Sequence, residues 1–352
     1  MRVLGLTRYS RMGASSRLRS YQYEAAWADA GVDVTWRPFL GDDYLVDLYE
    51  RRRRSARRIV AAYLRRLQAM GQSARFDLVW LEKEALPWIP NPIDPGLLRR
   101  NTPCVVDYDD AVFHYYDQSR SGVVRRMLGD KIAHVMRRAA LIVAGNPYLA
   151  QRAHDAGAKR IEIVPTVVDL RRYETIQRVP GEKFAVGWIG SPSTQSMIER
   201  LAPVLARALD ENTDTLVTIG ARFDKPLWAR HDMRRWSESS EVDEIRQLDV
   251  GVMPLVDQPF ERGKCGYKLI QYMACGLPVV ASPVGVNVEI VQHGVNGFLA
   301  SSDDEWIQAI ATLKSDADLR ARMGAAGRAT VERKYCLQVT APRLVELLRG
   351  VA

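Results

Sequence analysis

The sequence predicts an α/β protein with two Rossmann-like domains, each a doubly wound parallel sheet. Its 352 residues exceed one ordinary α/β core and suit two domains of roughly 170 residues each. Short β-rich apolar segments alternate with longer amphipathic stretches in both halves, which is typical of a parallel sheet covered by helices. With 47% apolar and 26% charged residues, the composition is that of a globular protein with a sizeable core.

The predicted strands fall into two series, one for each domain. Ligands of such sheets bind beyond the carboxyl ends of the strands, so the loops that follow the strands are where chemistry is expected. The two sheets are expected to face each other across a cleft. The strands are predicted at 2–6, 32–36, 76–81, 103–107, 141–144 and 161–164, and then at 184–189, 215–219, 250–253 and 278–281.

A polar, turn-rich stretch around Pro180 and Gly181 separates the two series and predicts the linker. The domain boundary is placed near residue 175, within about ten residues. The first domain is thus 1–175 and the second 176–335. Residues 336–352 predict a final helix that packs back toward the first domain.

The opening residues lack the apolar core and cleavage site of a signal peptide, and no run reaches the ~18 apolar residues of a membrane span. We therefore expect a cytoplasmic protein, with a peripheral position on the inner face of the membrane as a further possibility. The cysteines have no CxxC spacing, so they are expected to be reduced and structural zinc is not expected. They are Cys104, Cys265, Cys275 and Cys336.

The formal charge of +8 and the pI near 9.3 are compatible with a nucleic acid, an anionic membrane or a phosphorylated substrate as partner. Eight arginines lie between Arg51 and Arg66. On a helix, the apolar residues of this region share one face. They are Ala56, Ile59, Val60, Tyr63, Leu64 and Leu67.

This basic helix has three interpretations. Its apolar stripe is a core face with solvated arginines, or the helix lies on an anionic membrane beside a lipid-linked acceptor, where each basic side chain gains about 1 kcal/mol. Nucleic-acid binding comes last, because no finger, RNP or helix-turn-helix pattern accompanies the charge. We expect no nucleic-acid partner.

The stretch from Asp249 to Leu299 reads as strand, loop, helix, strand and loop. Gly263 and Gly266 bracket Lys264 and Cys265 just before a predicted helix at 267–274, and Lys268 lies in its first turn. Free N–H groups and the dipole of a helix N-terminus favour an anion, and two lysines could neutralise a diphosphate without a metal. The alternative is a capped helix with two surface lysines.

The pattern KLIQYMACGLPVVASPVG resembles the donor-binding segment of retaining glycosyltransferases of family 4, glycosyl transferases group 1, in the GT-B superfamily. Other stretches resemble the same family: GWIGSPST, VPTVVD, and Asn287 with Glu289 and the later Asn296. The resemblance covers most of the second half and, more weakly, the first. It implies a first domain that binds a hydroxyl acceptor and a second that binds a nucleotide sugar.

In that family, two glutamates separated by seven residues contact the donor sugar and its ribose. The corresponding residues here are Gly263 and Gln271. The Gln271 amide can still bind ribose hydroxyls, whereas Gly263 has no side chain for the sugar. Either Glu261 replaces it, or the backbone N–H groups of residues 264 to 266 hold sugar and phosphate; the second is preferred.

Many relatives take cations for the diphosphate from the loop after the first strand of the second domain. Here that loop starts Gly190, Ser191 and contains no cation, so Lys264 and Lys268 are assigned the electrostatic role. Gly190 and Ser191 are nevertheless expected to contact the nucleotide-sugar donor. The base is expected near Arg235 and Trp236.

In the first domain, Gly13 follows the first strand and permits a tight loop. Family members carry a glycine-rich loop there, which implies that Ser15, Ser16 and Arg17 reach a phosphate or the acceptor. The alternative is that Gly13 only relieves a turn.

Acidic residues and a histidine follow the strand predicted at 103–107. Paired aspartates could bind Mg²⁺, but the second-half motif belongs to a metal-free architecture, so no metal or other cofactor is expected. Asp110 or His114 is expected to orient the acceptor hydroxyl or contact the transferred sugar, with helix capping or solvation as the alternative. Asp107 and Asp109 share this segment, and Asn146 is expected to cap the next helix.

The resemblance implies a metal-independent hexosyl or related transfer with retention, for cell-surface polysaccharide or glycolipid synthesis. In the family's usual mechanism the leaving diphosphate accepts the acceptor proton, so catalysis rests on charge stabilisation and orientation. A sugar-nucleotide epimerase and a non-catalytic basic membrane adaptor are the alternatives. A dehydrogenase is disfavoured, because no GxGxxG follows a strand in either half.

Overall fold

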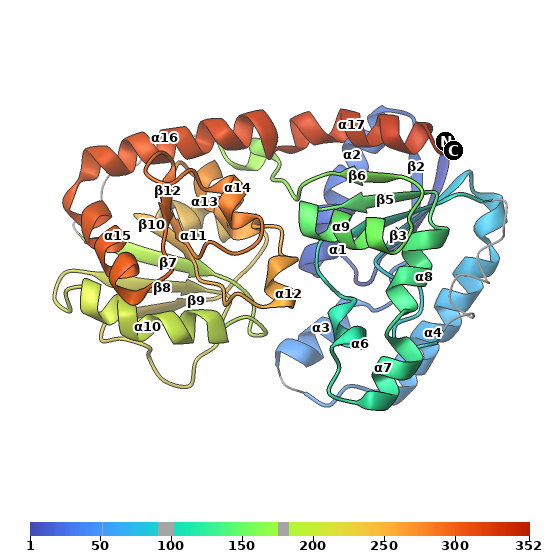
Figure 1. Ribbon diagram of the computed structural model, residues 1–352, viewed down its shortest axis with the longest axis horizontal. Coiled ribbons are helices and arrows are strands. Elements are labelled where there is room, and N and C mark those ends of the chain that lie inside the picture. The colour runs from blue at the N-terminus through green and yellow to red at the C-terminus, as the bar shows by residue number, and fades with distance from the viewer. Residues whose placement is uncertain (51, 91–101, 175–182) are drawn as a thin grey trace. The chain divides into compact units, whose positions relative to one another are not determined.

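The structure is a computed structural model that describes residues 1–50, 52–90, 102–174 and 183–352. The chain forms two compact units (Figure 1). Unit 1 comprises Met1–Thr166, Arg262–Cys265 and Thr340–Ala352, and unit 2 comprises Val167–Glu261 and Gly266–Val339. The units divide after Thr166, before the boundary predicted near 175, and the predicted linker around Pro180 and Gly181 lies outside the described residues. The sequence pattern gave no sign that Arg262–Cys265 joins unit 1.

The sheet of unit 1 has six parallel strands in the order β2-β1-β3-β4-β5-β6. Its central strands are buried along their whole length, as their continuous apolar runs predict. Each of the six strands overlaps a predicted one. They are β1 Arg2–Leu6, β2 Asp33–Trp36, β3 Leu78–Glu82, β4 Cys104–Tyr108, β5 Leu141–Ala144 and β6 Ile161–Ile163.

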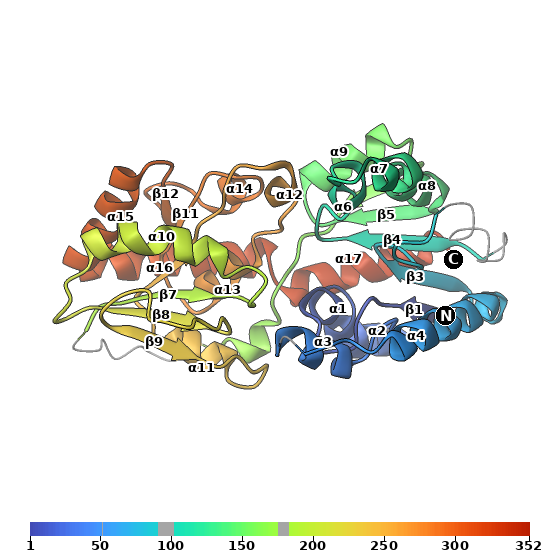
Figure 2. The ribbon, with the colours of Figure 1, turned by 90° about the horizontal axis from the view of Figure 1, so that it is seen from below.

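The helices of unit 1 form two groups, one near β1 and the other near β5. Seen from below in Figure 2, α1, α2 and α4 lie on the β1 side and α7, α8 and α9 on the β5 side. The helices are α1 Ala14–Arg19, α2 Glu24–Asp29, α3 Asp42–Tyr49, α4 Ala56–Gly71, α6 His114–Asp117, α7 Gly122–Leu128, α8 Lys131–Arg138 and α9 Pro147–Asp155, with short 3-10 turns η1 Tyr21–Tyr23 and η2 Ser73–Arg75.

The sheet of unit 2 also has six parallel strands, in the order β12-β11-β10-β7-β8-β9. Two of them, β9 and β12, were not predicted. Strand β9 has the polar sequence HDMR, and β12, with the sequence GFL, is too short to show a periodic pattern. The strands are β7 Ala185–Ile189, β8 Thr215–Ile219, β9 His231–Arg234, β10 Val250–Met253, β11 Val279–Ala281 and β12 Gly297–Leu299.

Two hydrophobic clusters cover the two faces of this sheet, because successive strand residues point to opposite sides. In β11, Val279 and Ala281 belong to one cluster and Val280 to the other. Figure 1 shows α16 above and α10 below the strands of unit 2. The helices are α10 Ser196–Ala208, α11 Glu241–Arg246, α12 Pro259–Arg262, α13 Tyr267–Ala274, α14 Asn287–Ile290, α15 Asp303–Ser315 and α16 Ala317–Lys334, with η3 Leu170–Arg172.

The final helix α17 spans Leu337–Arg349, within the helix predicted at 336–352, and its residues from Thr340 onward belong to unit 1. Within unit 1, the hydroxyl oxygens of Tyr23 and Thr340 lie 3.2 Å apart, and Arg343 contacts Glu162 at 3.2 Å. This end of the chain is therefore built into the first unit.

The basic helix differs from its prediction in extent and in face. Helix α4 begins only at Ala56, after the Ser55 cap, and Arg51 lies outside the described residues. Val60 and Leu64, predicted to share the core face, are 58% and 63% exposed. The buried positions are Ala62, Arg66, Ala69 and Met70.

The assignment of that face was wrong because a buried arginine takes a position that hydrophobicity would have given to an apolar residue. Arg66 donates a hydrogen bond to the Thr7 carbonyl and its guanidinium lies 5.6 Å from the Phe39 ring centre. The buried side of α4 therefore faces a different direction from Val60 and Leu64.

Within the parts of the chain that the structure describes, no helix is both long enough and apolar enough to cross a bilayer.

Candidate functional site

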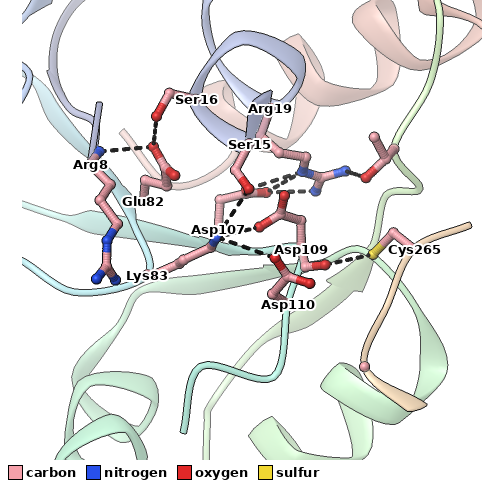
Figure 3. A network of polar contacts seen from close by, with 12 residues as sticks. Arg8, Ser15, Ser16, Arg19, Glu82, Lys83, Asp107, Asp109, Asp110 and Cys265 are labelled. Carbon is pink, nitrogen blue, oxygen red and sulfur yellow. Dashed lines mark hydrogen bonds and ion pairs between the residues drawn. The ribbon is translucent and has the colours of Figure 1, made fainter. Parts of the chain in front are cut away.

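Charged side chains gather where the strands of unit 1 end, at the edge where parallel sheets bind their ligands (Figure 3). Arg8 follows β1, Glu82 is the last residue of β3, and Asp107 is the residue before the last in β4. We call the set the unit 1 charge cluster. It comprises Arg8, Arg19, Lys83, Lys131 and Lys264 with Glu82, Glu84, Asp107, Asp109 and Asp110.

Arg19 anchors the buried side of the cluster to β4. Its Nε lies 3.1 and 3.0 Å from the two carboxylate oxygens of Asp107, and Nη2 lies 2.6 Å from Oδ1. The remaining guanidinium nitrogen donates to the Val164 carbonyl at 2.9 Å. Because both side chains are almost fully buried, this fork-shaped pair neutralises two charges that would otherwise be costly.

Lys83 occupies the centre of the cluster and has a strained backbone. Its Nζ lies 2.8 Å from Asp109 Oδ1 and 3.8 Å from Asp110 Oδ2, and it donates to Ser15 Oγ at 3.1 Å. Its φ is +65°, in the left-handed region that non-glycine residues rarely adopt. Such strain persists where the surroundings hold a residue for function.

Two glutamates flank Lys83 along the chain. Glu82 accepts hydrogen bonds from the Arg8 backbone N–H at 2.9 Å and from Ser16 Oγ at 2.6 Å. Glu84 lies 2.7 Å from Lys131 Nζ and accepts from the Tyr116 hydroxyl at 2.9 Å. Hydrogen bonds and an ion pair therefore connect the end of β3 to the segments on both sides of it.

The carboxylates of the cluster differ in proton affinity. Burial raises the pKa of Asp107 to about 6, although Arg19 opposes this rise. Burial also raises the pKa of Glu82. For Asp109, burial acts upward, but the Lys83 ammonium prevails and lowers its pKa. The pKa of Lys83 is in turn raised by Asp109 and Asp110 against the effect of burial, so the lysine stays charged.

The segment Arg262–Cys265 contacts this cluster within unit 1. The Asn146 amide donates to the carbonyls of Gly263 at 2.9 Å and Lys264 at 3.0 Å, while its oxygen accepts from the Leu149 N–H and so caps α9 as predicted. Lys264 Nζ lies 3.2 Å from Asp110 Oδ1. Asp110 therefore has an ionic partner that sequence reasoning did not assign to it.

Gly263 and Cys265 are close-packed. A Cβ on Gly263 would lie 2.5 Å from the Ala111 Cβ, so there is no room for a side chain at this position. Cys265 donates from Sγ to the Asp109 carbonyl at 3.2 Å, and burial raises its thiol pKa to about 12. Cys265 is thus a neutral packing residue and not a thiolate at neutral pH.

His114 lies at the start of α6 with both ring nitrogens engaged. Nδ1 lies 2.8 Å from Asp117 Oδ1, and Nε2 lies 2.8 Å from the Tyr148 hydroxyl. The ring packs against Phe113, and only 10% of the side chain is exposed. Tyr148 and Asp117 were absent from the sequence hypotheses.

The residues around Gly13 mainly hold the β1 loop together. Gly13 precedes α1, and a Cβ there would lie 2.5 Å from the Tyr9 Cβ. Ser15 and Ser16 bind Lys83 and Glu82 as described, and Arg17 reaches the Arg11 carbonyl at 3.3 Å. A glycine is therefore required here because the backbone at Gly13 lies close to the Tyr9 side chain.

In unit 2, the N-terminus of α13 has the features of an anion site. Gly266 precedes it with φ of +65°, and no side chain caps the helix. Lys268 Nζ lies 5.5 Å from the centre of the Trp188 ring, which also packs against Gly190. Asn287 is buried, and its Oδ1 has no hydrogen-bond partner among the described residues.

Other residues predicted at the donor are held by unit 2 itself. Gln271 is buried and donates to the Tyr173 hydroxyl at 3.2 Å. Trp236 is half-buried and donates to Glu241 at 2.8 Å. Ser191 shares a hydrogen bond of 2.7 Å with Ser193 in the loop after β7. Lys264 and Lys268, predicted as one electrostatic pair, belong to unit 1 and unit 2 respectively.

Sequence reasoning missed Arg8, Arg19, Glu82 and Lys83. The available signal was the run Glu82, Lys83, Glu84 directly after a buried apolar strand, since charged residues there follow the carboxyl end of a strand. Among the described residues, no group of three or more His, Cys, Asp or Glu side chains has the arrangement of a metal site.

In the comparison with known proteins, residues 184–316 match the family described as "Glycosyl transferases group 1". A GDP-mannose-dependent α-(1-6)-phosphatidylinositol monomannoside mannosyltransferase of Mycobacterium tuberculosis is 36% identical over 87 residues, 24% of this chain and 23% of that protein. A D-inositol 3-phosphate glycosyltransferase of Corynebacterium urealyticum is 31% identical over 180 residues, 50% of this chain and 37% of that protein. The aligned regions therefore span well under half of these relatives.

Solved structures resemble the whole chain. Sucrose-phosphate synthase of Thermosynechococcus elongatus has a TM-score of 0.74 at 16% identity, covering 100% of this chain and 99% of that one. HepE of Anabaena, solved with UDP-glucose, has a TM-score of 0.72 at 18% identity, covering 99% and 100%. At such identities the likeness shows the fold, which is GT-B.

Proposed function

We propose, on the premise that residues 184–316 belong to the glycosyl transferases group 1 family, that the chain is a glycosyltransferase. It would move a sugar, a hexose or a related one, from a nucleotide-diphosphate donor to a hydroxyl acceptor, with retention of configuration and without a metal. Unit 2 would bind the donor and unit 1 the acceptor. Cell-surface polysaccharide or glycolipid synthesis is the process we assign to it.

The observation that carries this proposal is the N-terminus of α13. Helix N–H groups without a side-chain cap, the positive end of the dipole and the Lys268 ammonium all favour a diphosphate. The buried, unpartnered Oδ1 of Asn287 would accept a hydrogen bond from a donor hydroxyl there. Solved relatives of the same fold bind UDP and UDP-glucose.

Lys268 takes the main electrostatic role in this proposal. Lys264 is already paired with Asp110, so part of its charge is neutralised within unit 1. As the donor bond breaks, charge develops on the leaving diphosphate, and a fixed ammonium beside it stabilises the transition state. The diphosphate would then take up the acceptor proton, so no protein nucleophile is required.

Thermal unfolding with UDP, GDP, ADP and dTDP tests the donor site. A diphosphate at a hundred times its Kd stabilises the protein by about 2.7 kcal/mol. Lys268→Ala should remove that shift, whereas Lys225→Ala, an exposed lysine of the same unit, should retain it. The assay is repeated with EDTA, which should leave the shift unchanged if no metal takes part. Absence of any shift in the wild type would favour the membrane-adaptor alternative.

A second observation favours a membrane partner for unit 1. Val60 and Leu64 are exposed on α4 beside the exposed arginines Arg57 and Arg65, so this part of the apolar stripe is not packed in the core. Apolar side chains among arginines suit the interface of an anionic bilayer. We therefore infer that α4 holds the enzyme beside a lipid-linked acceptor.

A further inference from the structure

We propose that Asp117, His114 and Tyr148 form a hydrogen-bonded chain whose outer end, the Tyr148 oxygen, accepts a hydrogen bond from the acceptor hydroxyl. The inference rests on the proposed function, and it makes Tyr148 the residue that touches substrate. His114 then becomes a positioning residue, in place of the direct contact that the sequence suggested.

The direction of the hydrogen bonds follows from the chemistry of the partners. An ionised Asp117 can only accept, so the hydrogen at 2.8 Å must come from His114 Nδ1. A neutral imidazole protonated at Nδ1 has an acceptor at Nε2, and the Tyr148 hydroxyl 2.8 Å away therefore donates to it. The phenol oxygen keeps its lone pairs for an outside donor.

Accessibility distinguishes the two candidates. Only 10% of the His114 side chain is exposed, and both its nitrogens are occupied. Tyr148 is half-buried, in the first turn of α9, and burial raises its pKa, so the hydroxyl remains protonated at neutral pH. A ligand approaching this edge of unit 1 meets the tyrosine oxygen before it meets the imidazole.

The surroundings hold the chain in place from several elements. Arg152 of α9 lies 3.1 Å from Asp117, and its guanidinium lies 4.8 Å from the Phe113 ring centre. Arg262 acts on Tyr148 electrostatically. The hydrogen-bonded chain is thus held between α6, α9 and the segment Arg262–Cys265.

Protonation of His114 would reverse the chain. Nε2 would then carry a hydrogen and donate to the Tyr148 oxygen, so that the tyrosine hydroxyl would turn outward as a donor. Asp117→Asn should produce the same reversal at neutral pH, because the amide can donate to Nδ1 and favour the other tautomer.

The experiment compares transfer with hydrolysis in the whole chain. Wild type, Tyr148→Phe and Asp117→Asn are assayed with a saturating nucleotide sugar and a panel of n-octyl glycosides as probe acceptors. Tyr148→Phe should lower transfer about tenfold, the scale for one hydrogen bond, and Asp117→Asn by ten- to a hundredfold. Hydrolysis of the donor by water should change less than twofold, because it needs no acceptor contact.

The imidazole nitrogens provide a readout that a structural role would not move. Nitrogen NMR of His114 at neutral pH should show the Nδ1–H tautomer in wild type and a changed Nε2 environment in Tyr148→Phe. Matched controls are Tyr49→Phe and Asp155→Asn, the latter in an exposed His–Asp pair with His154.

Wild-type transfer rates in Tyr148→Phe, or a His114 protonated at Nε2 in wild type, would overturn the inference while leaving the proposed function intact. If the wild type showed neither transfer nor hydrolysis, the proposed function would be overturned instead. The NMR result would still show whether His114 carries its proton on Nδ1, as the hydrogen-bonded chain requires.

Discussion

Lys83 Nζ and Asp109 Oδ1 lie 2.8 Å apart at the edge of the unit 1 sheet, and the lysine backbone is held at φ of +65°. An ion pair this enclosed is costly to break from one side, because the remaining charge stays buried. The ion pair therefore helps to hold the strained backbone after β3 against the carboxylates that follow β4.

Removal of the Lys83 charge should destabilise the protein. Lys83→Ala should lower the free energy of unfolding by about 3 kcal/mol, since Asp109 loses its partner. Lys83→Gly removes the same charge but accepts a positive φ, so it should retain about 1 kcal/mol more stability than the alanine variant. Urea denaturation of both variants measures this. Equal stability of the two would show that the backbone strain is negligible.

The close approach of Gly263 to Ala111 predicts that the family glutamate cannot be restored here. Gly263→Ala should cost about 2 kcal/mol by overpacking, because its Cβ would lie 2.5 Å from the Ala111 Cβ. Ala111→Gly should recover part of that loss in the double variant. Strictly additive effects of the two substitutions would contradict the contact.

Lys268 should contribute to the chemical step as well as to binding of the diphosphate. Lys268→Ala should reduce kcat roughly a hundredfold, the scale for loss of one charge stabiliser at a developing oxyanion. Steady-state kinetics with the nucleotide sugar identified by thermal shift checks this, with Lys225→Ala as the exposed control in unit 2. An unchanged kcat in a folded Lys268→Ala variant would exclude the assigned role.

Asp107 should give an unusual pH dependence of stability. Its pKa is raised from 3.8 to about 6 in the folded protein, so between these values the folded state binds the proton more tightly than the unfolded state. The contribution of Asp107 to the free energy of unfolding is therefore present at low pH and is lost as the pH rises. The total loss is about 3 kcal/mol.

The comparison with Asp107→Asn isolates this contribution. The variant also unpairs Arg19, but that cost does not depend on pH in this range. The difference in unfolding free energy, wild type minus variant, should fall between about pH 4 and pH 6.5. A difference that rises with pH would mean that Arg19 outweighs burial at this carboxylate.

The exposed arginines of α4 should determine binding to anionic lipid. Arg57→Gln combined with Arg65→Gln should weaken binding to phosphatidylglycerol vesicles by about 2 kcal/mol, close to 1 kcal/mol for each charge. Vesicle co-sedimentation measures this, with Arg207→Gln combined with Arg222→Gln in unit 2 as the control. Equal weakening by both pairs would point to overall charge and not to α4.

Much of the fold could be predicted because local apolar runs determine buried parallel strands. Strands β1, β5, β8 and β10 have the predicted bounds, as does helix α13, and α17 lies within the predicted range. The polar strand β9 and the short β12 could not be found this way, since only their neighbours in the sheet make them strands. The buried face of α4 was misassigned for a related reason, because Arg66 is buried by partners distant in sequence.

The sequence by itself determined two doubly wound sheets, the family resemblance of the second half and the loop before α13. Only the tertiary structure decided which charges meet. It places Lys264 against Asp110, 154 residues away, joins Arg19 to Asp107, and gives His114 the partners Asp117 and Tyr148. Ion pairs and hydrogen bonds act over a few ångströms in space, whereas sequence patterns report only periodicity along the chain, so the identity of each polar partner depends on the packing of the elements.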